Sequence, residues 1–195
     1  MIGNPAKDGS PRDRLLAAAD ELFYEHGVHT VGIDTIIEHA GVAKASLYST
    51  FRSKEGLVLA YLEARYDTRR ARLLAEIERH DDPPARLLAI FDLLAETVAE
   101  PGFRGCAFAN AAAESDLDSA AADVTRGVRT WLHETLRELA APLDVADPDS
   151  LARQLTLLYD GALAQSRLDP SPAAATAAKN AANELVRAAL ETGRT

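Results

Sequence analysis

The sequence is poor in the features that cross-link a fold or place it in a membrane. Its single cysteine, Cys106, excludes an internal disulfide and a cysteine-based structural zinc site. No apolar run reaches the roughly 18 residues that a membrane span requires, and the first residues contain no hydrophobic segment typical of a secretion signal. We therefore expect a cytoplasmic protein that does not associate with membranes.

Positive charge is also scarce. The chain has 21 basic and 30 acidic residues and a formal net charge of −9, which argues against a protein that coats nucleic acid through bulk charge. The deficit is uneven, because residues 1–72 contain ten residues of each sign and residues 73–195 account for the whole excess of acid. Because phosphate repels an acidic surface, any DNA-reading surface is expected in the N-terminal part.

Patterns that signal catalysis are missing as well. The five histidines have no partner at i+4 and no metal-type spacing among carboxylates. The sequence contains no nucleophile elbow, no glycine-rich phosphate loop and no zinc-protease motif. We expect no metal, no cofactor and no enzymatic activity, and a small α-helical enzyme is the least favoured reading of the chain.

Helical periodicity, in contrast, runs through almost the whole sequence. Apolar residues recur at helical spacing, prolines and glycines fall between the periodic segments, and no segment alternates with period two. The pattern predicts an all-α fold of about nine helices, over residues 11–26, 31–39, 43–50, 54–80, 85–99, 107–114, 119–141, 149–168 and 172–191. Ser10 is the expected cap of the first helix, and Thr30 of the second.

The most informative segment spans residues 30–57. Two short helices are expected on either side of Ala40-Gly41-Val42, which is the layout of a helix-turn-helix whose second helix enters the DNA major groove. That second helix has small and polar residues on its outward side, which lets a backbone approach base edges. Spacing alone leaves a plain helical hairpin equally open.

Residues 12–58 resemble the DNA-binding domain of the tetracycline-repressor-like (TetR/AcrR) family of bacterial regulators. The matching features are Gly27, Thr30, Ile33, Ala40-Gly41-Val42, Ser46-Leu47-Tyr48, Phe51, Ser53-Lys54-Glu55 and Leu57. One position departs from the pattern, because the family usually has His or Tyr before Phe51 and this chain has Thr50.

The resemblance implies a three-helix, helix-turn-helix DNA-binding domain over residues 1–58 and a role for each matching position. Thr30 would hold a phosphate, Tyr48 would reach a phosphate or a thymine methyl group, and Lys54 would contact the flanking phosphate. The full set expected at the DNA is Thr30, Lys44, Ala45, Ser46, Tyr48, Ser49, Thr50 and Lys54. For Tyr48 and Phe51, core packing is the competing reading.

Residues 59–195 are expected to form a helical ligand-binding and dimerisation domain. A pocket for a small-molecule effector is predicted among its helices, lined by Tyr66, Phe91, Phe103, Phe108, Asn110, Trp131 and Tyr159. For each of these residues plain core packing is the alternative. The final helices have Ala- and Leu-rich stripes over residues 151–163 and 174–189, which suit either intrachain packing or the homodimer, formed through the last two helices, that the family resemblance implies.

Residues 104–114 resemble a Gly-Cys…Asn-Ala-Ala-Glu segment at the sixth helix of one branch of the same family. Cys106 in this segment is either a small buried hydrophobe or a redox switch. Asn110 and Glu114 lie one turn apart, so they are expected to cap or hydrogen-bond neighbouring helices or to contact a ligand.

Together these features predict a ligand-responsive transcriptional regulator. It is expected to be a repressor that releases a pseudo-palindromic, double-stranded DNA operator when a small molecule binds. The alternative function is a helical small-molecule-binding protein that does not bind an operator.

Overall fold

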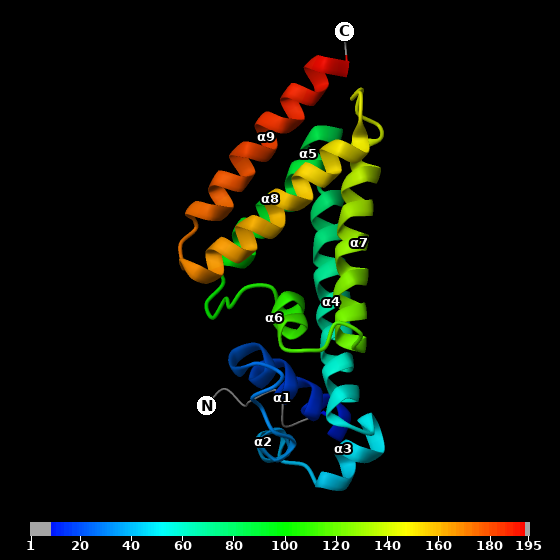
Figure 1. The fold of residues 1–195 in the computed structure, drawn as a ribbon, viewed down its shortest axis with the longest axis vertical. Helices are drawn as coiled ribbons and strands as arrows, with labels where there is room; N and C mark the ends of the chain where they lie inside the picture. The colour runs from blue at the N-terminus through cyan, green and yellow to red at the C-terminus, as the bar shows by residue number, and fades with distance from the viewer. Residues whose placement is uncertain (1–8, 194–195) are drawn as a thin grey trace. The chain divides into compact units, whose positions relative to one another are not determined.

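The structure, a computed structural model, describes residues 9–193 and confirms the all-α fold (Figure 1). Within that range it contains nine helices and no strand. The helices are α1 (Pro11–His26), α2 (Ile33–Ala40), α3 (Lys44–Phe51), α4 (Lys54–Glu78), α5 (Pro83–Ala99), α6 (Ala107–Ala113), α7 (Ala120–Ala140), α8 (Pro148–Leu168) and α9 (Ala173–Gly193).

Most helix ends follow the capping chemistry that the sequence displays. Ser10 and Asp13 form a capping box at the start of α1, in which each side chain accepts a hydrogen bond from the other residue's backbone N–H. The expected cap at Thr30 is wrong: α2 begins at Ile33, its N-cap is Gly32, and no side chain caps it. Thr30 instead lies in the turn that precedes α2.

The chain divides into two compact units. Of the described residues, the first unit comprises 9–67 and 107–126, and the second comprises 68–106 and 127–193. Both α4 and α7 contribute residues to each unit. The domain boundary expected at residue 58 therefore falls inside α4, and α6 groups with the N-terminal helices.

In the first unit, α1 packs against α2 and α3, and α2 packs against α3. The core is formed by fully buried side chains from each of these helices and from the start of α4, namely Leu15, Ile36, Leu47 and Leu57. Phe23 and Tyr61 add an edge-to-face aromatic pair with ring centroids 5.6 Å apart. The unit thus has its own apolar core.

A half-buried arginine links α1 to α4. Arg65 donates from Nε and Nη2 to the two carboxylate oxygens of Asp20, at 2.5 and 3.1 Å. Its guanidinium also lies 3.9 Å from the ring centroid of Tyr24 and 5.4 Å from that of Tyr61. Such a bidentate, stacked arrangement uses the planar shape of the group as well as its charge.

In the second unit, α9 packs against α8 and α5, and α5 packs against α8 (Figure 1). Its core contains Leu87, Ile90, Phe91, Leu155 and Ala182, all fully buried.

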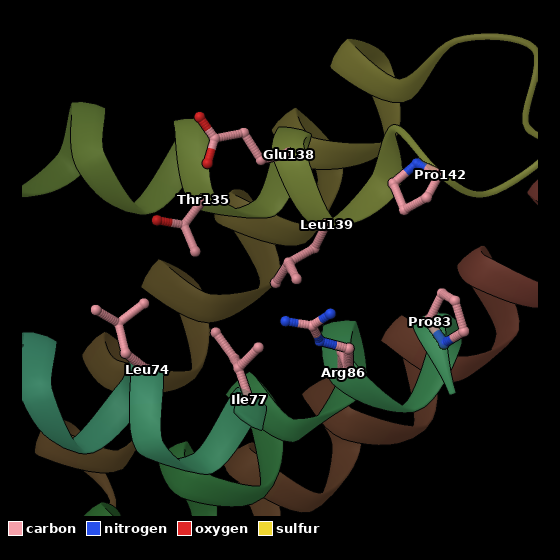
Figure 2. A pocket seen from close by; sticks show the side chains of 8 residues that line it. All are labelled: Leu74, Ile77, Pro83, Arg86, Thr135, Glu138, Leu139 and Pro142. Atoms are coloured by element: carbon pink, nitrogen blue, oxygen red, sulfur yellow. The ribbon is translucent and has the colours of Figure 1, made fainter. Parts of the chain in front are cut away.

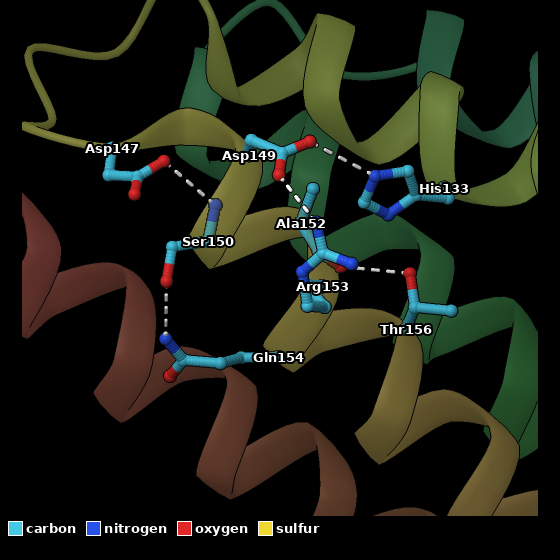
Figure 3. A network of polar contacts seen from close by, with 8 residues as sticks. All are labelled: His133, Asp147, Asp149, Ser150, Ala152, Arg153, Gln154 and Thr156. Carbon is cyan, nitrogen blue, oxygen red and sulfur yellow. Dashed lines mark hydrogen bonds and ion pairs between the residues drawn. The ribbon is translucent and has the colours of Figure 1, made fainter.

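Polar contacts join α7 to α8 in the second unit (Figure 3). Asp149 Oδ1 lies 3.2 Å from His133 Nε2 on α7, and Asp149 Oδ2 accepts from Arg153 at 2.7 Å. The hydrogen bond from Arg153, followed by that from His133, lowers the pKa of Asp149 below its usual value. Asp147 caps α8 by accepting from the backbone N–H of Ser150 at 2.9 Å.

Candidate DNA-binding and effector sites

A short left-handed turn joins α2 to α3. Gly41 has a φ of 60°, a conformation that favours glycine, and its N–H bonds back to the carbonyl oxygens of Ile37 and Glu38. Arg14 of α1 donates to the Gly41 carbonyl at 2.7 Å. The three helices and the turn therefore form a helix-turn-helix whose angle α1 helps to fix.

The two faces of α3 differ sharply. Leu47 and Phe51 are buried, so the core reading of Phe51 holds. The opposite face is exposed, and Tyr48 leaves 45% of its surface accessible. The exposed residues on α3 that were predicted to contact DNA are Lys44, Ala45, Tyr48, Ser49 and Thr50, and Ser46 is half-buried. The side of α3 opposite Leu47 and Phe51 thus presents most of the predicted DNA-contacting side chains to solvent.

The two lysines expected near DNA each have a partner within the first unit. Lys44 Nζ lies 2.8 Å from Asp34 Oδ1 on α2, and this hydrogen bond raises the pKa of Lys44. Lys54, at the first position of α4, donates to the carbonyl oxygen of His29 at 3.2 Å. Thr30 lies exposed beside this contact in the same turn. Lys54, at the start of α4, therefore bonds the residue that directly precedes Thr30 in this turn.

The loop between α1 and α2 is also held by the C-terminal end of α6. The Glu114 carboxylate accepts a hydrogen bond from the backbone N–H of His29 at 2.7 Å. Glu114 was expected to cap or hydrogen-bond a neighbouring helix, and its partner in the structure is instead the loop between α1 and α2. His29 thus binds an acidic side chain through its N–H and a basic one, Lys54, through its carbonyl oxygen.

The seven predicted effector-binding residues fall in both units, and their role stays a prediction. Phe91 and Tyr159 are buried in the second unit, where Phe103 and Trp131 are half-buried against the same core. In the first unit Phe108 is buried, and Tyr66 and Asn110 are half-buried.

A polar cluster that the sequence did not reveal surrounds Tyr159. Arg69 of α4 donates to the Tyr159 hydroxyl at 2.8 Å, and its Nη1 lies 4.0 Å from the Sγ of half-buried Cys106. Burial raises the pKa of Tyr159, although the Arg69 guanidinium opposes this shift. Arg69 was missed because an arginine on a charged stretch of helix resembles a surface residue.

A pocket of about 390 Å³ opens in the second unit, between α4, α5 and α7 (Figure 2). None of the seven predicted effector residues lines it. Over residues 9–193 no helix is long and apolar enough to span a membrane, and no cluster of three His, Cys, Asp or Glu side chains fits a metal ion.

One face of α8 bears exposed apolar and small residues one or two turns apart. These are Leu157, Gly161, Ala164 and Leu168, and Leu157 and Leu168 leave 64% and 81% of their surfaces accessible. A Cβ added at Gly161 would meet no atom within 4 Å. On α9, Ala178 and Val186 of the predicted stripe pack inside the chain, so that stripe is only partly available to a partner.

Comparison with known families matches the two halves of the chain separately. Residues 15–61 match the model described as bacterial regulatory proteins, tetR family, and residues 83–182 match that of the tetracyclin repressor-like C-terminal domain. The chain is 35% identical to the transcriptional regulator AcuR of Cereibacter sphaeroides, over 81% of this chain and 77% of that protein. It is 28% identical to the transcriptional repressor NemR of Escherichia coli K12, over 86% and 89% of the two chains.

Solved structures show the same relationship. The crystal structure of SCO4454, a TetR-family transcriptional regulator from Streptomyces coelicolor, is 32% identical and superposes with a TM-score of 0.88. The match covers 96% of this chain and all of that one.

Proposed function

Because the chain belongs to the tetR family of bacterial regulatory proteins, whose members are ligand-responsive DNA-binding regulators, we propose that it represses transcription by binding an operator as a homodimer. The observation that supports this most directly is α3. Its exposed face has small and polar side chains, while Leu47 and Phe51 bury its other face. A dimer presents two such helices to successive major grooves of a pseudo-palindromic site.

Seven of the eight predicted DNA-contacting residues have a proposed role that fits their position, and Ser49 is given none. Lys54, at the start of α4, and Thr30, in the turn before α2, contact phosphates, which fixes the register of the protein on the duplex. Lys44, Ala45, Ser46 and Tyr48 face the base edges and read the sequence. The hydroxyl of Thr50 donates to a phosphate where the family usually has His or Tyr.

The dimer interface is proposed on α8 and α9. The stripe that runs from Leu157 to Leu168 exposes apolar surface that no residue in the range 9–193 covers, and the absence of a side chain at Gly161 allows a second helix to approach closely. The Leu157–Leu168 stripe is therefore the surface against which a second copy packs.

An effector releases the operator if it binds the DNA-free arrangement of the dimer more tightly than the DNA-bound one. The chain then acts by binding and not by catalysis, in the cytoplasm, where its operator lies.

The test is operator binding measured by fluorescence anisotropy, with DNA from the intergenic region upstream of the protein's own gene, at several salt concentrations. Lys54→Ala is expected to weaken binding to all sequences alike and to reduce the salt slope by about one unit. Lys44→Ala is expected to change which operator variants are preferred. Arg79→Ala removes the same charge from an exposed residue just after α4, outside α3 and outside the proposed dimer interface, and is the control.

Two results would count against this proposal. If the wild-type chain bound the upstream DNA no better than random DNA, the alternative of a ligand-binding protein without an operator would be correct. If Lys44→Ala and Lys54→Ala gave the same sequence-independent loss, α3 would not be the recognition helix.

A further inference from the structure

The pocket between α4, α5 and α7 is mostly apolar. Its walls include Leu74 and Ile77 of α4 and Leu139 of α7, and Pro83 and Pro142 lie at one end (Figure 2). A volume of about 390 Å³ lies near the lower end of the range for small-molecule sites. The pocket therefore suits a small ligand with an apolar body.

The pocket also contains one cationic side chain, Arg86, whose Nε has no hydrogen-bond partner among residues 9–193. Arg86, on the first turn of α5, projects between Ile77 and Leu139 (Figure 2). Its Nε is buried and has no hydrogen-bond partner, and the guanidinium forms no ion pair with any residue in the range 9–193. A buried N–H donor needs an acceptor, so the half-buried Arg86 guanidinium is open to an anionic partner that reaches its Nε.

The two other polar residues of the pocket do not supply that counter-ion. Thr135 already donates its hydroxyl hydrogen to the Trp131 carbonyl oxygen at 2.8 Å, and a hydroxyl brings no charge. Glu138 lies exposed, and its carboxylate is not within ion-pair distance of Arg86. Glu138 adds negative charge to the lining of the pocket, which disfavours a ligand with more than one negative charge.

We propose that this pocket binds a small monocarboxylate with an apolar tail or ring, whose carboxylate pairs with the Arg86 guanidinium. A carboxylate matches the planar donor fork of arginine, and the apolar body fills the space along Leu74, Ile77 and Leu139. The inference rests on the proposed function in one respect, which is that the bound molecule acts as an effector.

The binding test uses three probes of the same chain length that differ only in the head group: octanoate, 1-octanol and octylammonium. Isothermal titration of the wild-type protein without DNA is expected to give a Kd for octanoate at least tenfold below that of the other two probes. Octanol binding as tightly as octanoate would overturn the proposal, as would preference for octylammonium or no measurable binding of octanoate.

Variants locate the binding. Arg86→Gln is expected to raise the Kd of octanoate at least tenfold, to the level of octanol. Arg79→Gln removes an arginine that is exposed and paired with Glu76, and is expected to leave all three Kd values unchanged. Leu139→Trp fills the pocket and is expected to weaken every probe. If Arg86→Gln or Leu139→Trp, folded by circular dichroism, bound octanoate as wild type does, the site would be elsewhere.

The effector role is tested separately. Octanoate is expected to lower operator affinity of the wild-type protein and not of Arg86→Gln, and an unchanged wild-type affinity would overturn that role. The binding titrations contain no DNA, so the two proposals are tested independently. If the protein bound no operator, the proposed function would be wrong, but the comparison of the three head groups would still decide whether the pocket binds a monocarboxylate.

Discussion

The carboxylate of Glu114, at the C-terminal end of α6, accepts a hydrogen bond from the backbone N–H of His29, 85 positions earlier in the chain, at 2.7 Å. The carbonyl of the same residue accepts from Lys54 at 3.2 Å. The side chains of Glu114 and Lys54, which are far apart in sequence, thus hydrogen-bond the backbone N–H and the carbonyl oxygen of the loop residue His29. This loop leads directly into α2, so its position affects where the helix-turn-helix begins.

Removing this contact should loosen the loop. Glu114→Ala is expected to lower the free energy of unfolding by about 1 kcal/mol, because it deletes a hydrogen bond to a charged group on the surface. If the loop also positions Lys54, operator affinity falls by up to about fivefold, the ratio that corresponds to this energy. Urea unfolding and operator titration measure the two effects. The control is Asp116→Ala, which removes an exposed carboxylate close by in the sequence. An equal loss of stability in that variant would mean that the removal of negative charge, and not of the hydrogen bond to His29, is responsible.

Gly27, two residues before His29, should tolerate no side chain. Its φ of 92° and ψ of 151° lie in a region that only glycine adopts readily, and an added Cβ would lie 2.5 Å from Glu114 Oε1. Gly27→Ala is expected to destabilise the protein by about 2–3 kcal/mol. Gly102→Ala provides the control, because φ there is 82° but no atom lies within 4 Å of the added Cβ. Its cost should be about 1 kcal/mol.

The double variant Gly27→Ala/Glu114→Ala separates the two causes of the destabilisation, which are backbone strain at residue 27 and the steric clash of the added Cβ with the Glu114 carboxylate. If the Glu114 carboxylate is part of the cost, the second substitution recovers some of the stability that the first removes, and the two effects are not additive. Thermal unfolding of the four proteins decides this, and strict additivity would show that backbone strain alone is responsible.

Two exposed helical glycines offer a matched test of the dimer interface. Gly161 on α8 lies in the stripe of Leu157 and Leu168, whereas Gly127 on α7 does not, and an added Cβ meets open space at both. Gly161→Arg is expected to yield monomers, because it places a charged chain where a second helix approaches. Gly127→Arg should leave the dimer intact. Light scattering coupled to size exclusion measures the mass, and a dimeric Gly161→Arg would remove α8 from the interface.

The contact between α7 and α8 predicts a pH dependence. The pKa of Asp149 is lowered in the folded chain by Arg153 and His133. A lowered pKa stabilises the fold above the unfolded value of about 3.9, and the stabilisation is lost as the pH falls through the folded value. Asp149→Asn should therefore be less stable than wild type at pH 7 and equal to it near pH 2. Urea unfolding at the two pH values tests this, with Asp118→Asn, on an exposed loop, as the control.

The sequence predicted the positions of the helices closely, because capping residues, prolines and glycines mark their ends and the apolar spacing marks their buried faces. Thr30 shows where this reasoning failed. Threonine is a good cap in general, but here the buried Val31 and the N-cap Gly32 delay the start of α2 to Ile33. Local capping preference was overridden by the way the loop packs.

The candidate sites were less predictable than the fold. The face of α3 followed from motif spacing, since a helix with two buried residues must expose the others. The contact of Arg69 with Tyr159 and the isolation of Arg86 depend on which side chains meet across helices far apart in sequence. No periodic pattern distinguishes these arginines from those on the surface.

The contacts of Arg65 limit which residues can replace it during evolution. Its guanidinium is matched by two carboxylate oxygens of Asp20 and by the faces of Tyr24 and Tyr61. Lysine has the same charge, but it lacks the planar fork and the stacking surface, so it would leave one oxygen of Asp20 without its donor. The exchange of arginine for lysine is ordinarily called conservative. At position 65, however, we expect that lysine is not tolerated and that related chains keep arginine there.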